Sequence, residues 1–264
     1  MPLGELEAAL REDLEDHLSV IASNCSAEAV GPAYESSEQA LEALACCKLL
    51  LHGDTAGFRR DLYWAATARR HYLKRSAAAG LKSATAQAFS RSQGWFCALA
   101  AGDLELAREI GDLSPKEWIS GAEYQDDFCY RNHLRLTLMK ADQIVRSNAL
   151  DQFERALQGQ SSPRLDLCLA IEKGATGGIQ GALLQLLRVH AIELDNLRPQ
   201  FLDQDSFEPR SRISTEGLGI IQLVHELGLG LAPLVVRHEL CPDIAQLGLM
   251  RTRPEDLFEM IDRA

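Results

Sequence analysis

Residues 178–194 have the sequence GIQGALLQLLRVHAIEL, and this stretch decides the class of fold. Its apolar side chains recur every three or four residues, which places them on one face of an α-helix. The residues on that face are Ile179, Leu183, Leu186, Leu187, His190, Ala191 and Leu194. The stretch therefore predicts an amphipathic helix that covers a core, with His190 as a hydrogen-bonded core histidine.

The same periodicity extends in both directions along the chain, and no run of alternating β-branched residues indicates a sheet. Asp103 and Ser214 are the expected N-caps of two helices, and Ser36 with Gln39 forms an expected capping box. Residues 198–212 are expected to form a polar loop. Helices are expected over residues 4–22, 36–52, 55–79, 84–101, 103–110, 124–140, 165–171, 178–194 and 214–227, with a helical turn at Pro115 and a last helix after Pro254.

Short links that contain glycine join several of these helices, so consecutive helices are expected to pack antiparallel. Residues 95–110 and 165–194 have a helix–turn–helix form similar to a tetratricopeptide hairpin, but no period of 34 residues is present. We therefore predict an all-α fold, an irregular stack of antiparallel helical hairpins. One domain is expected over residues 1–264, with residues 1–53 as its N-terminal helical part.

The composition limits the possible functions. The chain has 264 residues, of which 46% are hydrophobic, so it can bury a large core. Its formal net charge of -11 argues against binding to a nucleic-acid backbone and favours a basic protein partner. The carboxylates gather at one end, because residues 1–30 hold seven acidic residues and one arginine.

The sequence also predicts a cytoplasmic protein with no membrane anchor. No stretch approaches the roughly 20 apolar residues of a membrane span, and the first residues lack the cationic and apolar pattern of a signal peptide. The seven cysteines have no regular spacing and form no CxxC pair, so they are expected to be reduced core thiols without a metal.

No pattern indicates catalysis. His225 and Glu226 are followed by Leu-Gly-Leu, so the second histidine of a metalloprotease helix is missing. A glycine cluster at 174, 177, 178 and 181 meets neither the dinucleotide nor the Walker pattern, and it is interpreted as a helix stop followed by close helix packing. No Gly-x-Ser-x-Gly elbow occurs. We expect no catalytic residue, no cofactor and no metal site.

The candidate partner-binding residues combine aromatic and acidic side chains near a helix junction. They are Trp118, Glu123, Tyr124, Asp126 and Asp127, to which the polar loop adds Asp203, Asp205 and Glu208. This composition is typical of a recognition surface for a basic protein. The alternative is that the tryptophan is a core residue and the acids only face solvent. Arg69 falls on an apolar stripe, where burial would require carboxylate or carbonyl partners and a structural role is expected.

Several landmarks resemble a known family. They are Trp95 to Asp103 with the following Leu-Ser-Pro, Tyr124 to Phe128, Ser162 to Asp166, and Glu216 to Leu218. Together they are similar to the bacterial polymorphic-toxin immunity proteins of family forty-nine, over about residues 55–243. The resemblance implies an α-helical antitoxin that binds one secreted toxin and blocks it. It carries over no catalytic residue.

The expected function is therefore immunity against a cognate toxin, delivered by a contact-dependent or type VI route and acting in the cytoplasm. A nuclease is a natural target, because its basic cleft would be attracted to an acidic surface. The alternative from another class is a helical-repeat scaffold or adaptor with several partners. An enzyme is not expected, and the oligomeric state stays open.

Overall fold

The computed structural model describes residues 2–23, 25–82, 85–201, 204–229, 236–246, 250 and 252–263. Within these residues the chain forms helices and their connections and no β-strand, so the predicted all-α class is confirmed. The helices are α1 (Leu3–Ala22), α2 (Gly31–His52), α3 (Thr55–Ala78), α4 (Gly94–Ala101), α5 (Leu104–Leu113), α6 (Gln125–Leu138), α7 (Gln143–Ala156), α8 (Pro163–Glu172), α9 (Thr176–Leu197), α10 (Phe207–Arg210), α11 (Thr215–Glu226), α12 (Asp243–Gln246) and α13 (Leu257–Arg263), with 3-10 turns η1 (Thr85–Gln87) and η2 (Arg198–Gln200).

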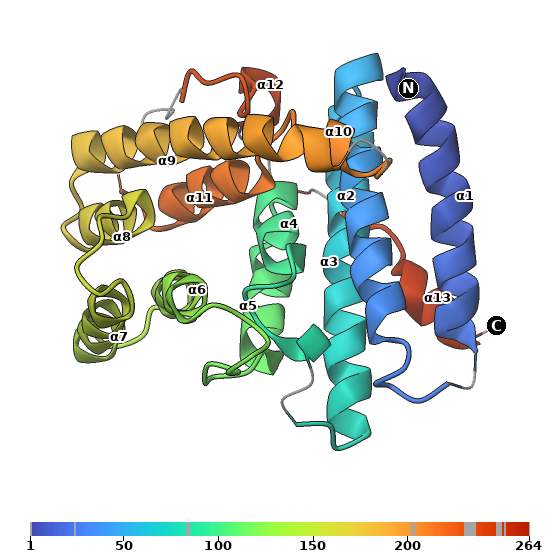
Figure 1. The fold of residues 1–264 in the computed structure, drawn as a ribbon, viewed down its shortest axis with the longest axis horizontal. Helices are drawn as coiled ribbons and strands as arrows, with labels where there is room; N and C mark the ends of the chain where they lie inside the picture. Colours follow the sequence, from blue (N-terminus) through green and yellow to red (C-terminus); the bar gives the residue numbers. More distant parts are fainter. Residues whose placement is uncertain are drawn as a thin grey trace.

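The helices form two differently oriented groups (Figure 1). Helices α1, α2 and α3 stand side by side, and α9 crosses the top of the molecule almost at a right angle to them. The pairs α2–α3, α6–α7 and α8–α9 pack as antiparallel hairpins. This arrangement confirms an irregular stack of hairpins, because the pairs meet at different angles and share no repeat.

Helix α4 lies at the centre of the fold and is surrounded by α3, α5 and α11. Every residue of α4 is buried, which agrees with its apolar sequence on all sides. Gly219 allows α11 to approach it, because a Cβ there would lie 3.1 Å from Leu99 Cβ and 3.2 Å from the Phe96 carbonyl oxygen. A larger residue at 219 would therefore push α11 away from α4.

One hydrophobic core runs through the helices from α2 to α13, and a second, smaller cluster joins α1 to α2. The smaller cluster contains Leu10 of α1 with Leu44 and Cys47 of α2. All seven cysteines are free thiols, and six of them are buried, as predicted. Cys25 is exposed and is not the core thiol that the sequence predicted. No helix in the described part of the chain is both long and apolar enough to cross a membrane.

Three buried arginines hold the irregular segments between helices. Arg69 of α3 donates to the carbonyl oxygens of Ala86, Gln87 and Ala88, and it is fully buried. Backbone carbonyls outside helices need donors when they are buried, and a guanidinium offers five N–H groups. The structural role predicted for Arg69, with carbonyl partners, is therefore confirmed.

Two arginines of α6 act in the same way. Arg131 donates to the carbonyl oxygens of Phe89 and Ser92, and its guanidinium lies 4.9 Å from the ring centre of Phe96. Arg135 donates to the carbonyl oxygen of Pro115 at 3.0 Å. These contacts fasten the segments on either side of α4 and α5 to α6.

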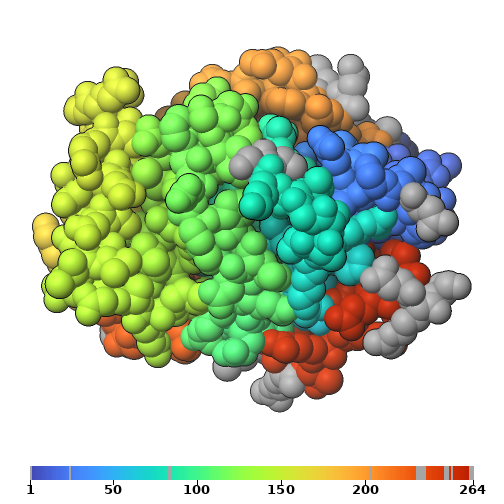
Figure 2. All heavy atoms as spheres, turned by 90° about the horizontal axis from the view of Figure 1, so that it is seen from below, coloured from blue at the N-terminus to red at the C-terminus, as the bar shows by residue number. Residues whose placement is uncertain are grey.

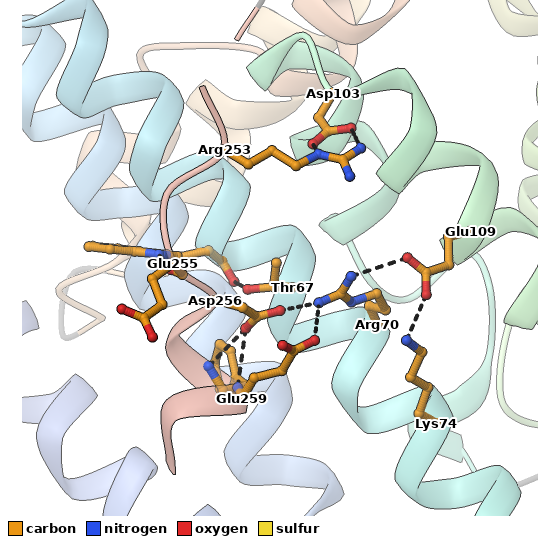
Figure 3. A network of polar contacts seen from close by, with 11 residues as sticks. Thr67, Arg70, Lys74, Asp103, Glu109, Arg253, Glu255, Asp256 and Glu259 are labelled. Atoms are coloured by element: carbon orange, nitrogen blue, oxygen red, sulfur yellow. Dashed lines mark hydrogen bonds and ion pairs between the residues drawn. The ribbon is translucent and has the colours of Figure 1, made fainter. Parts of the chain in front are cut away.

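The C-terminal segment 252–263 is fastened differently, by ion pairs between arginines and carboxylates (Figure 3). Arg253 forms a two-bond pair with Asp103 at 2.5 and 2.6 Å. Arg70 lies between Glu109, Asp256 and Glu259 and donates to all three. These pairs hold α13 against α3.

Phe258 anchors the same segment without charge. Its side chain is fully buried, and its ring centre lies 5.8 Å from that of Tyr34 and 5.9 Å from that of His71. The Trp64 indole nitrogen also donates to the Glu255 carbonyl oxygen. The C-terminal segment therefore combines one buried aromatic ring with a surrounding set of polar contacts.

Some predicted helix boundaries are wrong. Helix α2 begins at Gly31 with Pro32 in its first turn, so Ser36 lies inside the helix and does not cap it. Of the predicted helix 84–101, residues 85–93 are not helical apart from η1, because Arg69 and Arg131 bind carbonyl oxygens that a helix would bond internally. No helix starts at Pro115.

Helix α7 was not predicted at all. Its buried side chains, Ala149, Leu150 and Phe153, form a narrow stripe, while Ile144 and Val145 are exposed and obscure the periodicity. The predicted polar loop 198–212 contains η2 and the short helix α10. The caps Asp103 and Ser214 are confirmed, because their side chains accept from the backbone N–H groups of Leu106 and Gly217.

Two further interpretations are corrected in α9. His190 is only half-buried and not a core residue. Gly174 ends α8 with a positive φ of 61°, as expected of a helix stop. Gly177 and Gly181, however, have no atom within 4 Å of an added Cβ, so they do not serve close helix packing within this chain.

Candidate functional site

The loop between α5 and α6, residues 114–124, is held in one conformation by Glu123. Its carboxylate accepts from the Ser90 N–H at 2.8 Å, from the Ser90 hydroxyl at 2.7 Å and from the Ile119 N–H at 3.3 Å. The Trp118 indole nitrogen donates to the Glu123 carbonyl oxygen at 2.9 Å. Glu123 is therefore an internal anchor of the loop, although the sequence suggested a direct contact with a partner.

The same loop turns two aromatic side chains toward solvent. Tyr124 is 78% exposed and Trp118 is 39% exposed, and Asp126 lies half-buried in the first turn of α6. We call Trp118, Glu123, Tyr124, Asp126 and Asp127 the loop cluster. Residues of about 100–135, in green, occupy the middle of the face in Figure 2, between the end of α3 and α7. The reading of Trp118 as a pure core residue does not fit its exposure.

Asp127 does not face solvent with Tyr124 but points into a polar cluster between α6, α8 and α11. The Arg164 guanidinium of α8 donates to Asp127 at 2.7 Å and to Glu216 of α11 at 3.4 Å. It also lies 5.0 Å from the ring centre of Tyr130, whose hydroxyl donates to Glu216 at 2.9 Å. One arginine thus joins the first turns of α6 and α11.

Burial and charge act against each other at these carboxylates. Burial raises the pKa of Asp127 above its ordinary value, although Arg164 opposes the shift. Burial alone would also raise the pKa of Glu216, but Arg164 and Arg131 together bring it below its ordinary value. Glu216 therefore stays ionised at neutral pH, and Asp127 is the member that protonates more easily.

The cluster opens into a cavity beneath α9. The cavity has a volume of about 110 Å³ and is lined by Arg164, Glu216, His190 and Glu193, among others. A neighbouring cavity of about 140 Å³ shares His190, Ser214 and Glu216 and reaches Phe207 and Arg210 of α10. Together they form a groove that runs from the side of Asp127 to the side of α10.

The second group of predicted residues lies at the α10 end. Glu208 accepts hydrogen bonds from both Arg198 and Arg212, so its charge is matched within the chain. Asp205 is half-buried beside α10, and Asp203 lies outside the described residues. The first group belongs to the α5–α6 loop and the start of α6, and the described members of the second to α10 and the residues before it.

The sequence analysis missed Arg164, Glu216 and Tyr130 as members of a cluster. Arg164 and Glu216 both stand in the first turn of a helix, just after the serines at positions 162 and 214. Both stretches were noted as landmarks, but nothing in the sequence shows that they meet. Only the packing of α6, α8 and α11 brings them together.

The described residues include no group of three or more histidine, cysteine, aspartate or glutamate side chains that could hold a metal ion. The buried thiols are also poor nucleophiles, since burial raises the pKa of Cys97 and Cys168 well above the ordinary value. The arrangement offers positioned charges and exposed aromatic rings.

Scans of the chain against protein-family models, curated proteins and solved structures find no match. The function must therefore be argued from the chain itself.

Proposed function

We propose that this protein is an immunity protein, which binds and neutralises one cognate toxin, and that the loop cluster forms part of the contact surface. The observation that carries the proposal is the loop itself, where Glu123 fixes the backbone and Trp118 and Tyr124 point outward. Aromatic anchors dominate the energy of protein interfaces, and a loop fixed in advance loses little entropy when it binds.

The distribution of charge supports a basic partner. On α1 the exposed side chains of Glu12, Asp13, Glu15 and Asp16 make no ion pair within the described part of the chain. Arg69 and Arg131, by contrast, lie inside and donate to backbone carbonyls, so their charge neutralises no surface carboxylate. The surface therefore carries unbalanced negative charge that would accelerate encounter with a basic protein.

The resemblance to the immunity proteins of family forty-nine points to the same function. A cytoplasmic toxin with a basic, nucleic-acid-binding cleft fits the charge best, and a type VI effector nuclease is the partner that we propose. The protein would act by occupying the toxin, with no chemistry of its own.

The first test is co-purification of the tagged chain with the product of the adjacent reading frame, together with growth of cells that express that product. We expect a stable complex and restored growth when both are present. A neighbouring product that is neither toxic nor bound would overturn the immunity proposal.

The surface is tested with Tyr124→Ala combined with Asp126→Asn. Loss of a hot-spot aromatic ring and one charge should weaken binding by at least about tenfold, since 1.4 kcal/mol corresponds to a factor of ten. Ile192→Ala removes another exposed apolar side chain, 63% exposed, from α9 and should leave binding unchanged. Equal affinities for the two variants would exclude the loop cluster.

The second candidate is a scaffold or adaptor, which the succession of antiparallel hairpins favours. A scaffold would bind several partners with no toxic neighbour. Recovery of several unrelated partners, all indifferent to Tyr124→Ala, would favour this candidate over immunity.

A further inference from the structure

Six helices end in the same pattern, in which the N–H of the residue after a positive-φ residue bonds back to a carbonyl oxygen five or six positions earlier in the chain. In five of them the preceding residue, with positive φ, is a glycine: Gly53, Gly80, Gly102, Gly174 and Gly228. In α6 that position holds Lys140, with a φ of 54°, and Ala141 N–H bonds to the Leu136 carbonyl oxygen. A side chain with a Cβ is disfavoured there, and lysine has no turn-forming group of its own.

Lys140 lines a surface cavity of about 310 Å³ between α6, α7 and α8. Two more cations line it, Arg146 of α7 and Lys173 at the end of α8, and Leu227 and Leu229 supply apolar wall. The three positive charges come from three separate parts of the chain. They converge although the protein as a whole has a net charge of -11.

Only one of these charges is matched. Arg146 donates to both oxygens of Glu172, at 2.7 and 3.3 Å, and Glu172 is the one carboxylate among the residues that line the cavity. Lys140 and Lys173 make no ion pair with the described residues. The cavity therefore carries about two positive charges in excess.

The buried His133 beside the cavity does not change this excess of positive charge. The His133 side chain lies 3.6 Å from the Glu172 carboxylate, and burial lowers its pKa to about 4. His133 is therefore neutral at pH 7. A helix end by itself would favour lysine electrostatically, which accounts for Lys173, but it does not account for a lysine in the left-handed region.

We propose that this cavity is a binding site for a compact phosphate-type anion that carries at least two negative charges. Such a ligand would match the two unpaired ammonium groups. Arg146, whose guanidinium already donates to Glu172 and to the Ala141 carbonyl oxygen, would contribute mainly its charge. The apolar side chains of Leu227 and Leu229 keep part of the cavity from water and strengthen the attraction. This proposal is independent of the protein-binding surface, which lies at the other end of α6.

Calorimetric titration of the full chain with inorganic pyrophosphate at pH 7.5 and low salt tests the site. We expect one pyrophosphate per chain, and at least about tenfold weaker binding for acetate, which carries a single charge. No binding of pyrophosphate, or equal binding of acetate, would overturn the proposal.

Lys140→Gly is the decisive variant, because its two effects have opposite signs. Glycine suits a positive φ, so the variant should unfold at a higher urea concentration than the parent chain. The loss of one cation should weaken pyrophosphate binding by about fivefold or more. Unchanged affinity in Lys140→Gly would show that Lys140 does not belong to a binding site.

Two further variants serve as a second test and a control for Lys140→Gly. Lys173→Ala removes the second unpaired cation and should weaken binding by a similar factor. Lys82→Ala removes an exposed lysine outside the cavity and is the matched control. If Lys82→Ala weakened binding as much as Lys173→Ala, the attraction would be a general effect of charge and the proposed site would be excluded.

Discussion

Residues 85–93 and the C-terminal segment 252–263 are both bound by an arginine of α3, but through different kinds of partner. The first is held by the fully buried Arg69, which donates to backbone carbonyl oxygens. The second is held by ion pairs with carboxylates: Arg70, with a side chain 14% exposed, pairs with Asp256 and Glu259, and Arg253, with a side chain 53% exposed, pairs with Asp103 (Figure 3). A charged contact contributes most to stability where its removal leaves buried polar groups that water cannot reach, as the carbonyl oxygens around Arg69 would be.

The largest expected effect comes from Arg69→Met. This change leaves the carbonyl oxygens of Ala86, Gln87 and Ala88 without their donor and should lower the free energy of unfolding by about 3–5 kcal/mol. Urea unfolding measures the loss. Arg11→Met breaks an exposed pair with Glu7 and, as the control, should change stability by less than about 0.5 kcal/mol. Similar losses for the two variants would show that burial does not decide how much an arginine contributes to stability in this fold.

The second largest effect is a dependence of stability on pH, because burial shifts the pKa values of two side chains in opposite directions. Burial raises the pKa of Glu38, beside Arg69, to about 7 from 4.5. The folded chain then keeps a proton that the unfolded chain has lost, so this contribution to stability disappears as pH rises from 4.5 to 7. Burial lowers the pKa of His133 from 6.5 to about 4. Its contribution is present above pH 6.5 and disappears as pH falls to 4.

In the parent chain the two effects on the free energy of unfolding partly cancel as pH changes. A variant that removes one group should reveal the pH dependence that the other causes. With Glu38→Gln, stability should rise with pH between 4 and 6.5 by about 1–2 kcal/mol, since only the His133 effect remains. With His133→Phe, which keeps a ring in the core, stability should fall between pH 4.5 and 7. Urea unfolding across this range checks both. If stability changed with pH in the same direction in both variants, the pKa shifts assigned to Glu38 and His133 would be contradicted.

The smallest effect is expected at the C-terminal segment. Arg253 is 53% exposed, so Arg253→Gln should cost at most about 1 kcal/mol at low salt, and less at high salt. Amide exchange in residues 252–263 should nevertheless become faster, because one of the polar contacts of the segment is lost. A large, salt-independent loss would place Arg253 with the buried fastenings.

The sequence analysis predicted the helices with a wide apolar face and missed the element without one. Residues 178–194 were predicted from periodicity and form most of α9, whereas α7 buries too few side chains to show a pattern. Residues 84–93 were predicted to be helical from their composition. Arg69 and Arg131, distant in sequence, bind carbonyl oxygens in that segment and give it a non-helical course.

The sequence likewise predicted only part of the candidate surface. Composition indicated Trp118, Tyr124 and the neighbouring acids, and their exposure is compatible with recognition. The internal role of Glu123, the link from Asp127 to Arg164 and the separation of Glu208 from this group could not be predicted. Each of these depends on a contact between residues that are far apart in the chain or on the course of a loop.

By itself, the sequence determined the all-α class, the caps at Asp103 and Ser214 and the excess of negative charge, because these depend on local spacing and on composition. The tertiary structure alone decided which charges are matched. It turned Arg131 inward, set Arg164 against Glu216, and left Lys140 and Lys173 unpaired around one cavity. The physical reason is that the energy of a charge depends on the partners and the water around it, and the packing of distant helices sets both.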